Sequence, residues 1–151
     1  MKKKFHYHKQ ETEYTCGAAS LKMILEYFGI EKTEKELMKM LKTNEVRGSL
    51  TKDFFPVLKK LKLNYLVKSN ATIRELKKFQ KQGYMIIVCY YLPEEKCDHY
   101  AVLRKIDFRF IHLFDPWYGP EHKLKIHDFE KLWHSDFNVE KQIRWALAIK
   151  K

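Results

Sequence analysis

The spacing of apolar residues changes once along this chain, at Gly83, and that change restricts the folds open to it. Before Gly83, apolar side chains recur at intervals of three and four residues, which is typical of helices that bury one face. After Gly83, they follow the alternating or continuous patterns of strands. Because a run of helices precedes a run of strands, we expect an α+β fold and not a parallel, doubly wound sheet.

Capping and breaking residues predict where the elements lie. A helix begins at Cys16 and stops before Gly29, and capping boxes at residues 33–36 and 72–75 start two more helices. A further helical segment is expected at 50–61. Strands are expected at 65–67, 84–92, 99–106, 110–115, 123–126 and 141–149, and a short helix near 128–132.

Length and composition indicate a single folded domain that covers residues 1–151. Of the 151 residues, 45% are hydrophobic and 15% are aromatic, and there are only 5 glycines and 4 prolines. This composition is typical of a globular domain and argues against a fibrous or disordered chain. We expect a mainly helical part, residues 1–83, to pack on a mainly antiparallel sheet, residues 84–151.

The N-terminus and the cysteine count favour a cytoplasmic protein. The basic residues at 1–4 are followed by polar and aromatic residues instead of the apolar core of a signal peptide. No apolar run approaches the length that spans a membrane. Three cysteines, an odd number, in a chain of this kind favour reduced thiols.

Cys16 begins the first expected helix, and the small residues Gly17, Ala18 and Ala19 follow it. A thiol at a helix N-terminus lies at the positive end of the helix dipole, which stabilises a thiolate. The unpaired backbone N–H groups of the first turn can also bind an oxyanion. The pattern therefore favours a nucleophile over an inert thiol of the core.

Three distant residues offer the groups that would activate such a thiol. Gln10 can donate a side-chain hydrogen bond to an oxyanion, His99 precedes an apolar strand and Asp115 precedes a proline. Taken singly, these residues also suit a surface amide, a strand-end histidine and a turn-forming aspartate. Their order along the chain favours one common site with Cys16.

The expected hairpin between 99–106 and 110–115 gives a geometric test of this set. If the turn is centred on Asp107, His99 faces Asp115 across the two strands, with Cβ atoms about 5 Å apart. The same register pairs Ala101 with Leu113 and residue 103 with residue 111 on one apolar face. The turn has no glycine, so a longer loop or a bulge would shift this pairing.

These blocks together resemble the papain-like cysteine peptidases, and more narrowly the bacteriocin-processing (double-glycine leader) peptidases and their stand-alone relatives. The resemblance covers roughly residues 5–150. It implies a papain-like fold, with the nucleophile on a helical lobe and the base on an antiparallel sheet. It also implies a nucleophile, a general base and acid, an orienting acid and an oxyanion donor, which are Cys16, His99, Asp115 and Gln10.

Four further residues are expected to contact the substrate because they flank these groups: Tyr14, Thr15, Gly17 and Trp117. Thr15 stands where many members of the resembled family carry an acidic residue, which leaves the substrate preference open. Trp117 follows the Asp115 block directly. It is read either as lining the cleft, as shielding the acid and base from water, or as a core residue.

No cofactor and no metal ion are expected. Cys89 lies in an apolar strand and is read as a small core residue. Cys97 is close to His99 in sequence, so a zinc site of Cys89, Cys97 and His99 is conceivable, but no paired-cysteine or clustered-histidine spacing supports it. The remaining histidines are read as surface or packing residues: His6, His8, His112, His122, His127 and His134.

The net charge of +11 and the isoelectric point near 9.5 favour anionic partners, including an acidic peptide or protein substrate. The lysines are spread over every expected helix, with glutamates between many of them, as on solvated surfaces. No nucleic-acid-binding motif is evident, so nucleic acid is not the expected partner.

The favoured function is hydrolysis of a peptide bond through a Cys-His-Asp triad and a thioester acyl-enzyme. Two alternatives remain open at this point. The same triad would serve an acyltransferase or transpeptidase that uses an amine in place of water. The chain would otherwise be a basic partner-binding module with a vestigial site.

Overall fold

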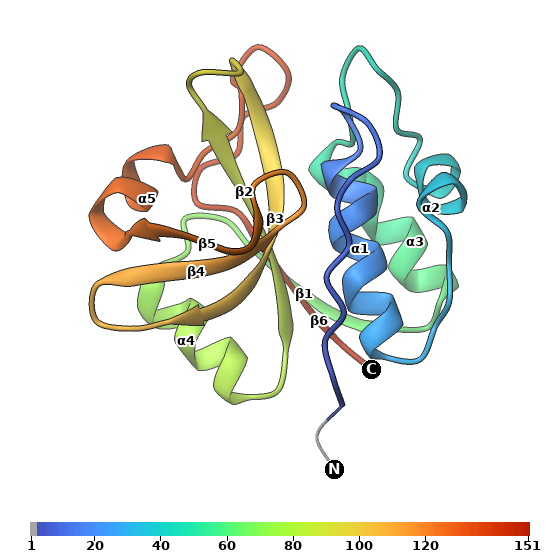
Figure 1. Cartoon of the computed structure of the whole chain (residues 1–151), viewed down its shortest axis with the longest axis horizontal. Helices are drawn as coiled ribbons and strands as arrows, with labels where there is room; N and C mark the ends of the chain where they lie inside the picture. Colours follow the sequence, from blue (N-terminus) through green and yellow to red (C-terminus); the bar gives the residue numbers. More distant parts are fainter. Residues whose placement is uncertain (1–2) are drawn as a thin grey trace.

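The computed structural model describes residues 3–151, so Met1 and Lys2 of the basic N-terminus lie outside it. Residues up to Gly83 form the helices and the edge strand α1 (Cys16–Tyr27), α2 (Glu34–Met40), η1 (Thr51–Asp53), α3 (Phe54–Lys60), β1 (Asn64–Lys68) and α4 (Ile73–Lys81). The remainder forms β2 (Met85–Leu92), β3 (Cys97–Ile106), β4 (Phe110–Asp115), β5 (Gly119–Lys125), α5 (Ile126–Leu132) and β6 (Ala146–Lys150). The expected α+β class is confirmed (Figure 1).

The strands form one antiparallel sheet of 6 strands in the order β1-β6-β2-β3-β4-β5. The last strand, β6, lies between β1 and β2, and its residue Ile149 pairs with Tyr65 on one side and Met85 on the other. The end of the chain therefore joins the helical part to the hairpins of the second part.

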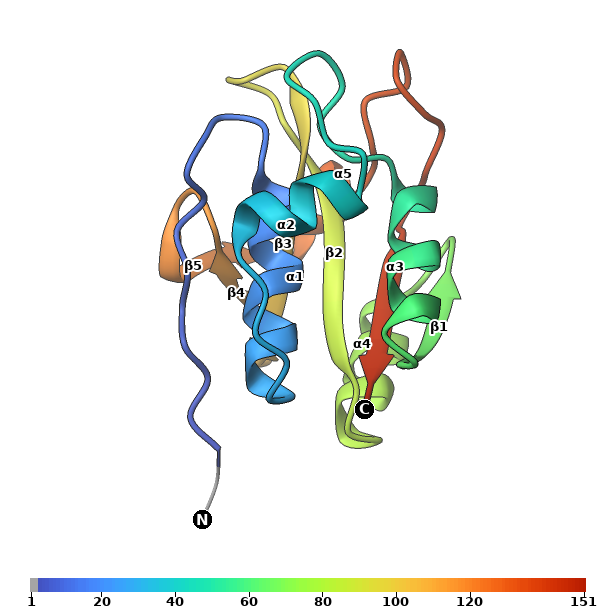
Figure 2. The same ribbon diagram turned by 90° about the vertical axis from the view of Figure 1, so that its right-hand side faces the viewer.

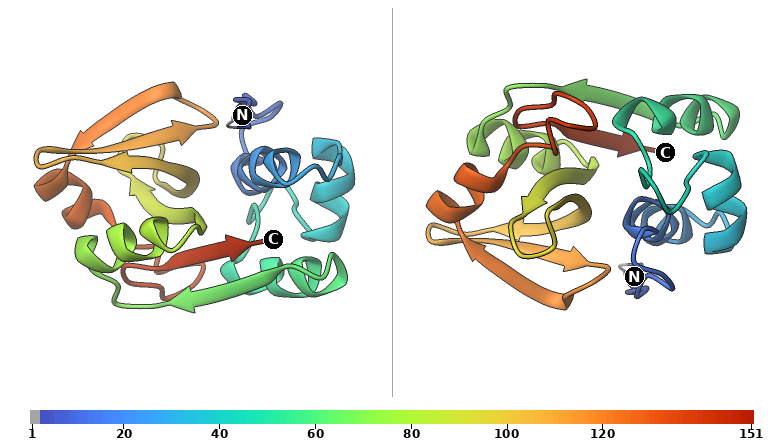
Figure 3. Two further views of the ribbon diagram at one scale, coloured as in Figure 1. Left: turned by 90° about the horizontal axis from the view of Figure 1, so that it is seen from below. Right: turned by 90° about the horizontal axis from the view of Figure 1, so that it is seen from above.

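Helices lie on both faces of the sheet (Figure 3), and a hydrophobic core fills the space between the helices and each face. One core joins α1, α2 and α3 to residues such as Ile87 and Val102. The other joins α4 and α5 to residues such as Val88 and Ala101. Both faces of β2 and β3 are covered, which explains why these strands are continuous apolar runs. The helices of the first part do not form one layer, because α4 lies across the sheet from the other three.

The expected helix boundaries follow from local chemistry. Gly29 ends α1 with a φ of +83°, a left-handed conformation that glycine adopts without steric cost. The capping box of α2 is formed by Thr33 and Glu36, whose hydrogen bonds measure 2.8 and 3.1 Å. Thr72 and Glu75 cap α4 in the same way.

Several element bounds differ from those expected. The helical segment expected at 50–61 is a 3₁₀ turn followed by α3. The strand expected at 123–126 already begins at Gly119, and residue 126 starts α5. The strand expected at 141–149 begins only at Ala146, because Gln142 and Arg144 bond through their backbones to Ser135 and Trp133 in the loop after α5.

The register predicted for the β3–β4 hairpin is wrong by two residues near the site. Leu103 pairs with Leu113, and Val102 pairs with Phe114, after an irregularity between Leu103 and Lys105. Asp115 is therefore not directly opposite His99. Because the displacement is an even number of residues, the face on which each side chain lies is preserved.

The turn between β3 and β4 contains no glycine and is stabilised by the side chain of Asp107. Asp107 Oδ1 accepts hydrogen bonds from the N–H groups of Arg109 and Phe110, at 2.8 and 2.7 Å. Its other oxygen lies 2.7 Å from Nε2 of His112. An aspartate that bonds to the backbone just ahead of it fixes a turn without a left-handed residue. His112 thus has a carboxylate partner that the sequence did not reveal.

None of the helices described over residues 3–151 is both long and apolar enough to cross a lipid bilayer.

Candidate active site

A cleft of about 960 Å³ opens at one end of the molecule, beside the N-terminus of α1. Its walls come from segments 10–14, 45–49, 92–100 and 136–139, together with Trp117. Figures 1 and 2 show the loops of these segments at the same end. Gln10 and Cys16 lie in this cleft together with His99, which is distant from both in the sequence.

Cys16 is the first residue of α1, as expected, and its side chain is largely covered. The backbone N–H of Tyr100 on β3 points to its Sγ atom at 3.5 Å. The first N–H groups of an α-helix have no acceptor within the helix. The N–H of Cys16 is therefore able to donate to a ligand in the cleft.

His99 connects Cys16 with Asp115. Its Nε2 atom lies 2.7 Å from Oδ1 of Asp115, and both side chains are buried. Cys16 lies in the same cleft as His99, and its Sγ atom accepts the N–H of Tyr100, the residue that follows His99. A thiol, an imidazole and a carboxylate in this order are the arrangement that can activate a cysteine nucleophile.

Other hydrogen bonds hold the carboxylate of Asp115 in place. Its Oδ1 atom also accepts the backbone N–H groups of Trp117 and Tyr118, at 2.9 and 3.0 Å. Its Oδ2 atom accepts the hydroxyl of Tyr90 on β2. The carboxylate is therefore fixed in position by four donors, of which His99 is one, although it is wholly buried.

The two buried partners shift each other's pKa. Burial lowers the pKa of His99, but the Asp115 carboxylate and Cys16 outweigh burial and raise it to about 10. Burial raises the pKa of Asp115, but the charge and hydrogen bond of His99 bring it below its ordinary value. His99 therefore holds a proton firmly near neutral pH.

Gln10 lies in the same cleft and is only 6% exposed. Its Nε2 atom donates to the carbonyl of Thr12 at 2.7 Å. A carboxamide nitrogen carries two N–H groups, so a second donor is left. The Oε1 atom of Gln10 is buried and has no hydrogen-bond partner among residues 3–151.

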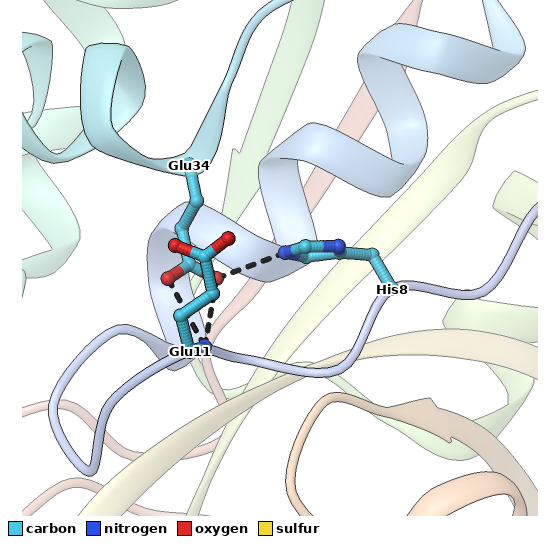
Figure 4. A group of neighbouring side chains, drawn as sticks. All are labelled: His8, Glu11 and Glu34. Atoms are coloured by element: carbon cyan, nitrogen blue, oxygen red, sulfur yellow. Dashed lines mark hydrogen bonds and ion pairs between the residues drawn. The ribbon is translucent and has the colours of Figure 1, made fainter.

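Hydrogen bonds fix the backbone around Gln10 to the segment after β4 and to the start of α2. The N–H of Gln10 donates to the carbonyl of Pro116 at 2.9 Å. Glu34, at the start of α2, accepts the N–H of Glu11 with both carboxylate oxygens, at 3.2 and 3.1 Å, and its Oε1 atom lies 3.0 Å from Nε2 of His8 (Figure 4). The Glu34 side chain is buried. It therefore anchors the backbone next to Gln10.

Two of the four expected substrate contacts lie in the cleft, and two do not. Tyr14 and Trp117 are part of its wall. Thr15 is fully buried and its hydroxyl bonds to Thr12, so it closes the loop before the helix instead of facing the cleft. Gly17 is buried against Ser49: an added Cβ would lie 3.0 Å from its Oγ atom. The lack of a side chain at 17 thus permits packing and does not leave space for substrate.

The other cysteines differ from Cys16 in their surroundings. Burial raises the pKa of the Cys89 thiol well above its ordinary value. Burial and the neighbouring Cys16 and Asp98 raise the pKa of Cys97 to about 11. The conceivable zinc ligands Cys89, Cys97 and His99 do not gather their ligand atoms within 4.8 Å of one another.

One group of side chains among residues 3–151 does have that spacing, namely His8, Glu11 and Glu34 (Figure 4). Both oxygens of Glu34 are already used to hold the N–H of Glu11 and the ring of His8. This arrangement is explained by its structural role.

Sequence reasoning missed Tyr90 and Glu34. Tyr90 pairs directly with His99 across β2 and β3, so a correct register for that pair would have found it. Glu34 is indistinguishable in sequence from an acidic residue that stabilises the first turn of a helix. No signal in the sequence separates the buried carboxylate from an exposed one.

Solved structures show the same fold. The peptidase domain of Streptococcus ComA, a bifunctional ABC transporter of a quorum-sensing pathway, aligns with a TM-score of 0.76 and 17% identity, over 97% of this chain and 98% of that chain. A double glycine motif protease from an AMS/PCAT transporter, in complex with the leader peptide, aligns with a TM-score of 0.75 and 19% identity. The alignment covers 99% of this chain and 93% of that chain. A C39-like peptidase from Bacillus anthracis aligns with a TM-score of 0.72 and 18% identity, over 97% of this chain and 94% of that chain.

No curated protein sequence matches the chain significantly. The sequence pattern of the Peptidase C39 family, in contrast, matches residues 4–137, which include Gln10, Cys16, His99 and Asp115. The papain-like fold and the cysteine peptidase character expected from the sequence agree with this match. The chain therefore belongs to the Peptidase C39 family.

Proposed function

We propose that this protein hydrolyses peptide bonds with Cys16 as nucleophile, His99 as general base and acid, and Asp115 as the residue that orients and charges His99. The observation that carries the proposal is that Cys16 and His99 line one cleft, with Asp115 at 2.7 Å behind His99. Surface or core residues would have no reason to meet in this order.

The reaction would proceed by acyl transfer through a thioester. The raised pKa of His99 favours a thiolate–imidazolium pair, in which the proton of the Cys16 thiol already resides on His99, and the Sγ thiolate attacks the peptide carbonyl. The imidazolium then gives its proton to the leaving amine, and the C–N bond breaks. A water molecule that gives a proton to His99 attacks the thioester, and the acid product and the free thiol are released.

Two donors are available for the oxyanion of the tetrahedral intermediates. The N–H of Cys16 lies at the open first turn of α1. The second N–H of Gln10 Nε2 is the other donor, and the backbone bond of Gln10 to Pro116 keeps that residue next to the triad. Both donors are held before the substrate arrives, so little reorganisation is needed as charge develops.

A peptide is the proposed substrate class. One protein of the same fold is a double glycine motif protease in complex with a leader peptide. We propose cleavage after a pair of glycines as the first specificity to test. Because all three cysteines are free thiols, we also propose that the protein works in a reducing compartment, the cytoplasm.

The test is cleavage of a peptide library derived from a digested proteome, with new N-termini identified by mass spectrometry. We expect the wild-type protein to produce new termini and the Cys16→Ala variant to produce none, while the two unfold at similar temperatures. Serine at position 16 serves as a second variant of nearly the same size.

Two results would oppose the proposal. Equal cleavage by wild type and Cys16→Ala would assign the activity to something other than this thiol. Absence of any cleavage, with Cys16 no more reactive than a free thiol, would favour a vestigial site. If added amines appear in the products as new amides, the enzyme is an acyltransferase that uses the same triad.

A further inference from the structure

The charge of the cleft is opposite to that of the molecule. The chain has 30 lysines and arginines against 19 aspartates and glutamates. The wall of the cleft, in contrast, contains only two of the basic residues, Arg47 and Lys96. It contains six of the acidic residues: Glu11, Glu13, Glu45, Glu95, Asp98 and Asp136.

The acidic residues of the cleft are not neutralised by ion pairs. None of the six forms a salt bridge with any residue in the described part of the chain. Of the two basic residues, Arg47 is already paired with Asp53 at 2.8 Å and also donates to the carbonyl of Lys42. Lys96 alone is left to balance them, so the cleft has an excess of negative charge.

Two ionisable groups of the cleft have raised pKa values, first because they are buried and second because of neighbouring negative groups. Burial and the carboxylates of Glu140 and Asp136 raise the pKa of Asp98 to about 6. Burial, Cys16 and the neighbouring carboxylates, among them Glu95, also raise the pKa of Cys97. The carboxylates of Glu95, in the β2–β3 turn, and Asp136, in the loop after α5, therefore act electrostatically on groups at the start of β3.

Five of the six carboxylates come from loops that reach one end of the molecule, and the sixth, Asp98, lies at the start of β3. Glu13 lies in the loop before α1, Glu45 in the loop after α2, and Glu95 in the turn between β2 and β3. These loops lie at the same end of the molecule (Figure 2), and each contributes residues to the wall of the cleft. Apolar side chains lie among them, since Val46 is 91% exposed and Val139 is also exposed at the wall of the cleft.

We propose that the cleft selects peptides with lysine or arginine residues near the scissile bond, and apolar residues beside them. This inference rests on the proposed peptidase function: the triad identifies the cleft as the substrate site, and the carboxylates determine which peptide enters. A cationic peptide gains Coulomb attraction in a cleft of one sign, whereas an acidic peptide is repelled. The overall charge of the protein would suggest the reverse preference.

The test uses synthetic peptides that share one sequence cleaved by the enzyme and differ at flanking positions, which carry lysine, glutamine or glutamate. We expect kcat/KM to fall in the order lysine, glutamine, glutamate, by roughly tenfold or more between the extremes at low salt. The difference should shrink as ionic strength rises, because four of the six carboxylates, those of Glu11, Glu13, Glu45 and Glu95, are exposed to solvent.

Matched variants distinguish the cleft from the rest of the surface. The double substitution Glu45→Gln with Glu95→Gln removes two exposed carboxylates of the cleft. The control, Glu31→Gln with Glu121→Gln, removes two exposed carboxylates outside it. We expect the first pair to reduce the preference for lysine over glutamate severalfold and the control pair to leave it unchanged.

The outcomes separate this inference from the proposed function. Cleavage at equal rates for all three peptides, or a preference for glutamate, would overturn the selection of cationic peptides and leave the peptidase intact. A preference for lysine that the Glu45 and Glu95 substitutions do not alter would also overturn it. If no peptide is cleaved by wild type and Cys16 is not reactive, the peptidase function itself fails.

Discussion

Tyr90 donates its hydroxyl hydrogen to Asp115 Oδ2, on the oxygen that His99 leaves free. The Tyr90 ring also lies edge-on to the His99 ring, with centroids 5.4 Å apart. One tyrosine on the neighbouring strand therefore contacts both the acid and the base of the proposed triad.

Replacing Tyr90 with phenylalanine should weaken the site without removing it. The substitution leaves one oxygen of a buried carboxylate without a donor, which costs about 1–3 kcal/mol. We expect a lower free energy of unfolding in urea and a lower kcat. Tyr91→Phe is the matched control, since Tyr91 stacks on His134 and has no contact of this kind. Equal losses in the two variants would contradict a specific role for the Tyr90 hydroxyl.

Replacing Asp115 with asparagine should change the pH dependence of activity. The carboxylate raises the pKa of His99 to about 10, whereas burial alone lowers it. In the Asp115→Asn variant, His99 should lose the proton that it gives to the leaving amine at a lower pH than in the wild type. We expect the alkaline limb of kcat/KM to move to lower pH and turnover to fall. An unchanged alkaline limb would show that Asp115 does not control the proton of His99.

The same pair predicts how stability depends on pH. Because the pKa of His99 is raised on folding, its contribution is fully present below its unfolded pKa of about 6.5 and is lost as pH rises through about 10. The free energy of unfolding of the wild type should therefore decline between these values. Asp115→Asn should show little decline, and a parallel decline would refute the linkage.

Among the three thiols, Cys16 should react first with limiting iodoacetamide at neutral pH. Burial raises the pKa of Cys89 and Cys97, whereas Cys16 lies at a helix N-terminus beside His99. Peptide mapping after short exposure measures the order of alkylation. His99→Ala should slow the reaction of Cys16. Faster labelling of Cys97 would argue against Cys16 as the activated thiol.

Gln10 should contribute to turnover more than to binding. Loss of one oxyanion donor typically costs about 10²–10³ in kcat, and Gln10→Glu removes the donor at nearly constant size. We expect kcat to fall by that order and KM to change little. Gln82→Glu, at an exposed position at the end of α4, is the control. A loss confined to KM would assign Gln10 to substrate binding instead.

Glu34→Gln should loosen the segment that carries Gln10. The buried carboxylate accepts the N–H of Glu11 with both oxygens and contacts His8, and an amide cannot accept with both of its atoms. We expect a loss of about 1–3 kcal/mol in the free energy of unfolding, together with a lower kcat. Glu31→Gln, an exposed position before the same helix, should have neither effect.

The sequence determined the parts of this protein that depend on local chemistry. The start of α1 at Cys16, its end at Gly29 and the capping boxes of α2 and α4 follow from residues within one or two turns. The α+β class follows from the change of apolar spacing. The sequence also indicated which distant residues would gather, because Gln10, Cys16 and His99 lie in one cleft and Asp115 lies directly behind His99.

Only the tertiary structure decided the features that depend on packing between distant segments. The hairpin register depended on the bonds of Asp107 and on an irregularity near Leu103, and neither can be read from strand propensity. Burial of Thr15 and the contact of Gly17 with Ser49 excluded two expected substrate residues. The net charge of +11 is a sum over the chain, and a sum does not say where charges lie. Only the packing of the helices and the sheet brings six carboxylates without salt bridges, five on loops and one on β3, into the wall of the cleft that contains Cys16.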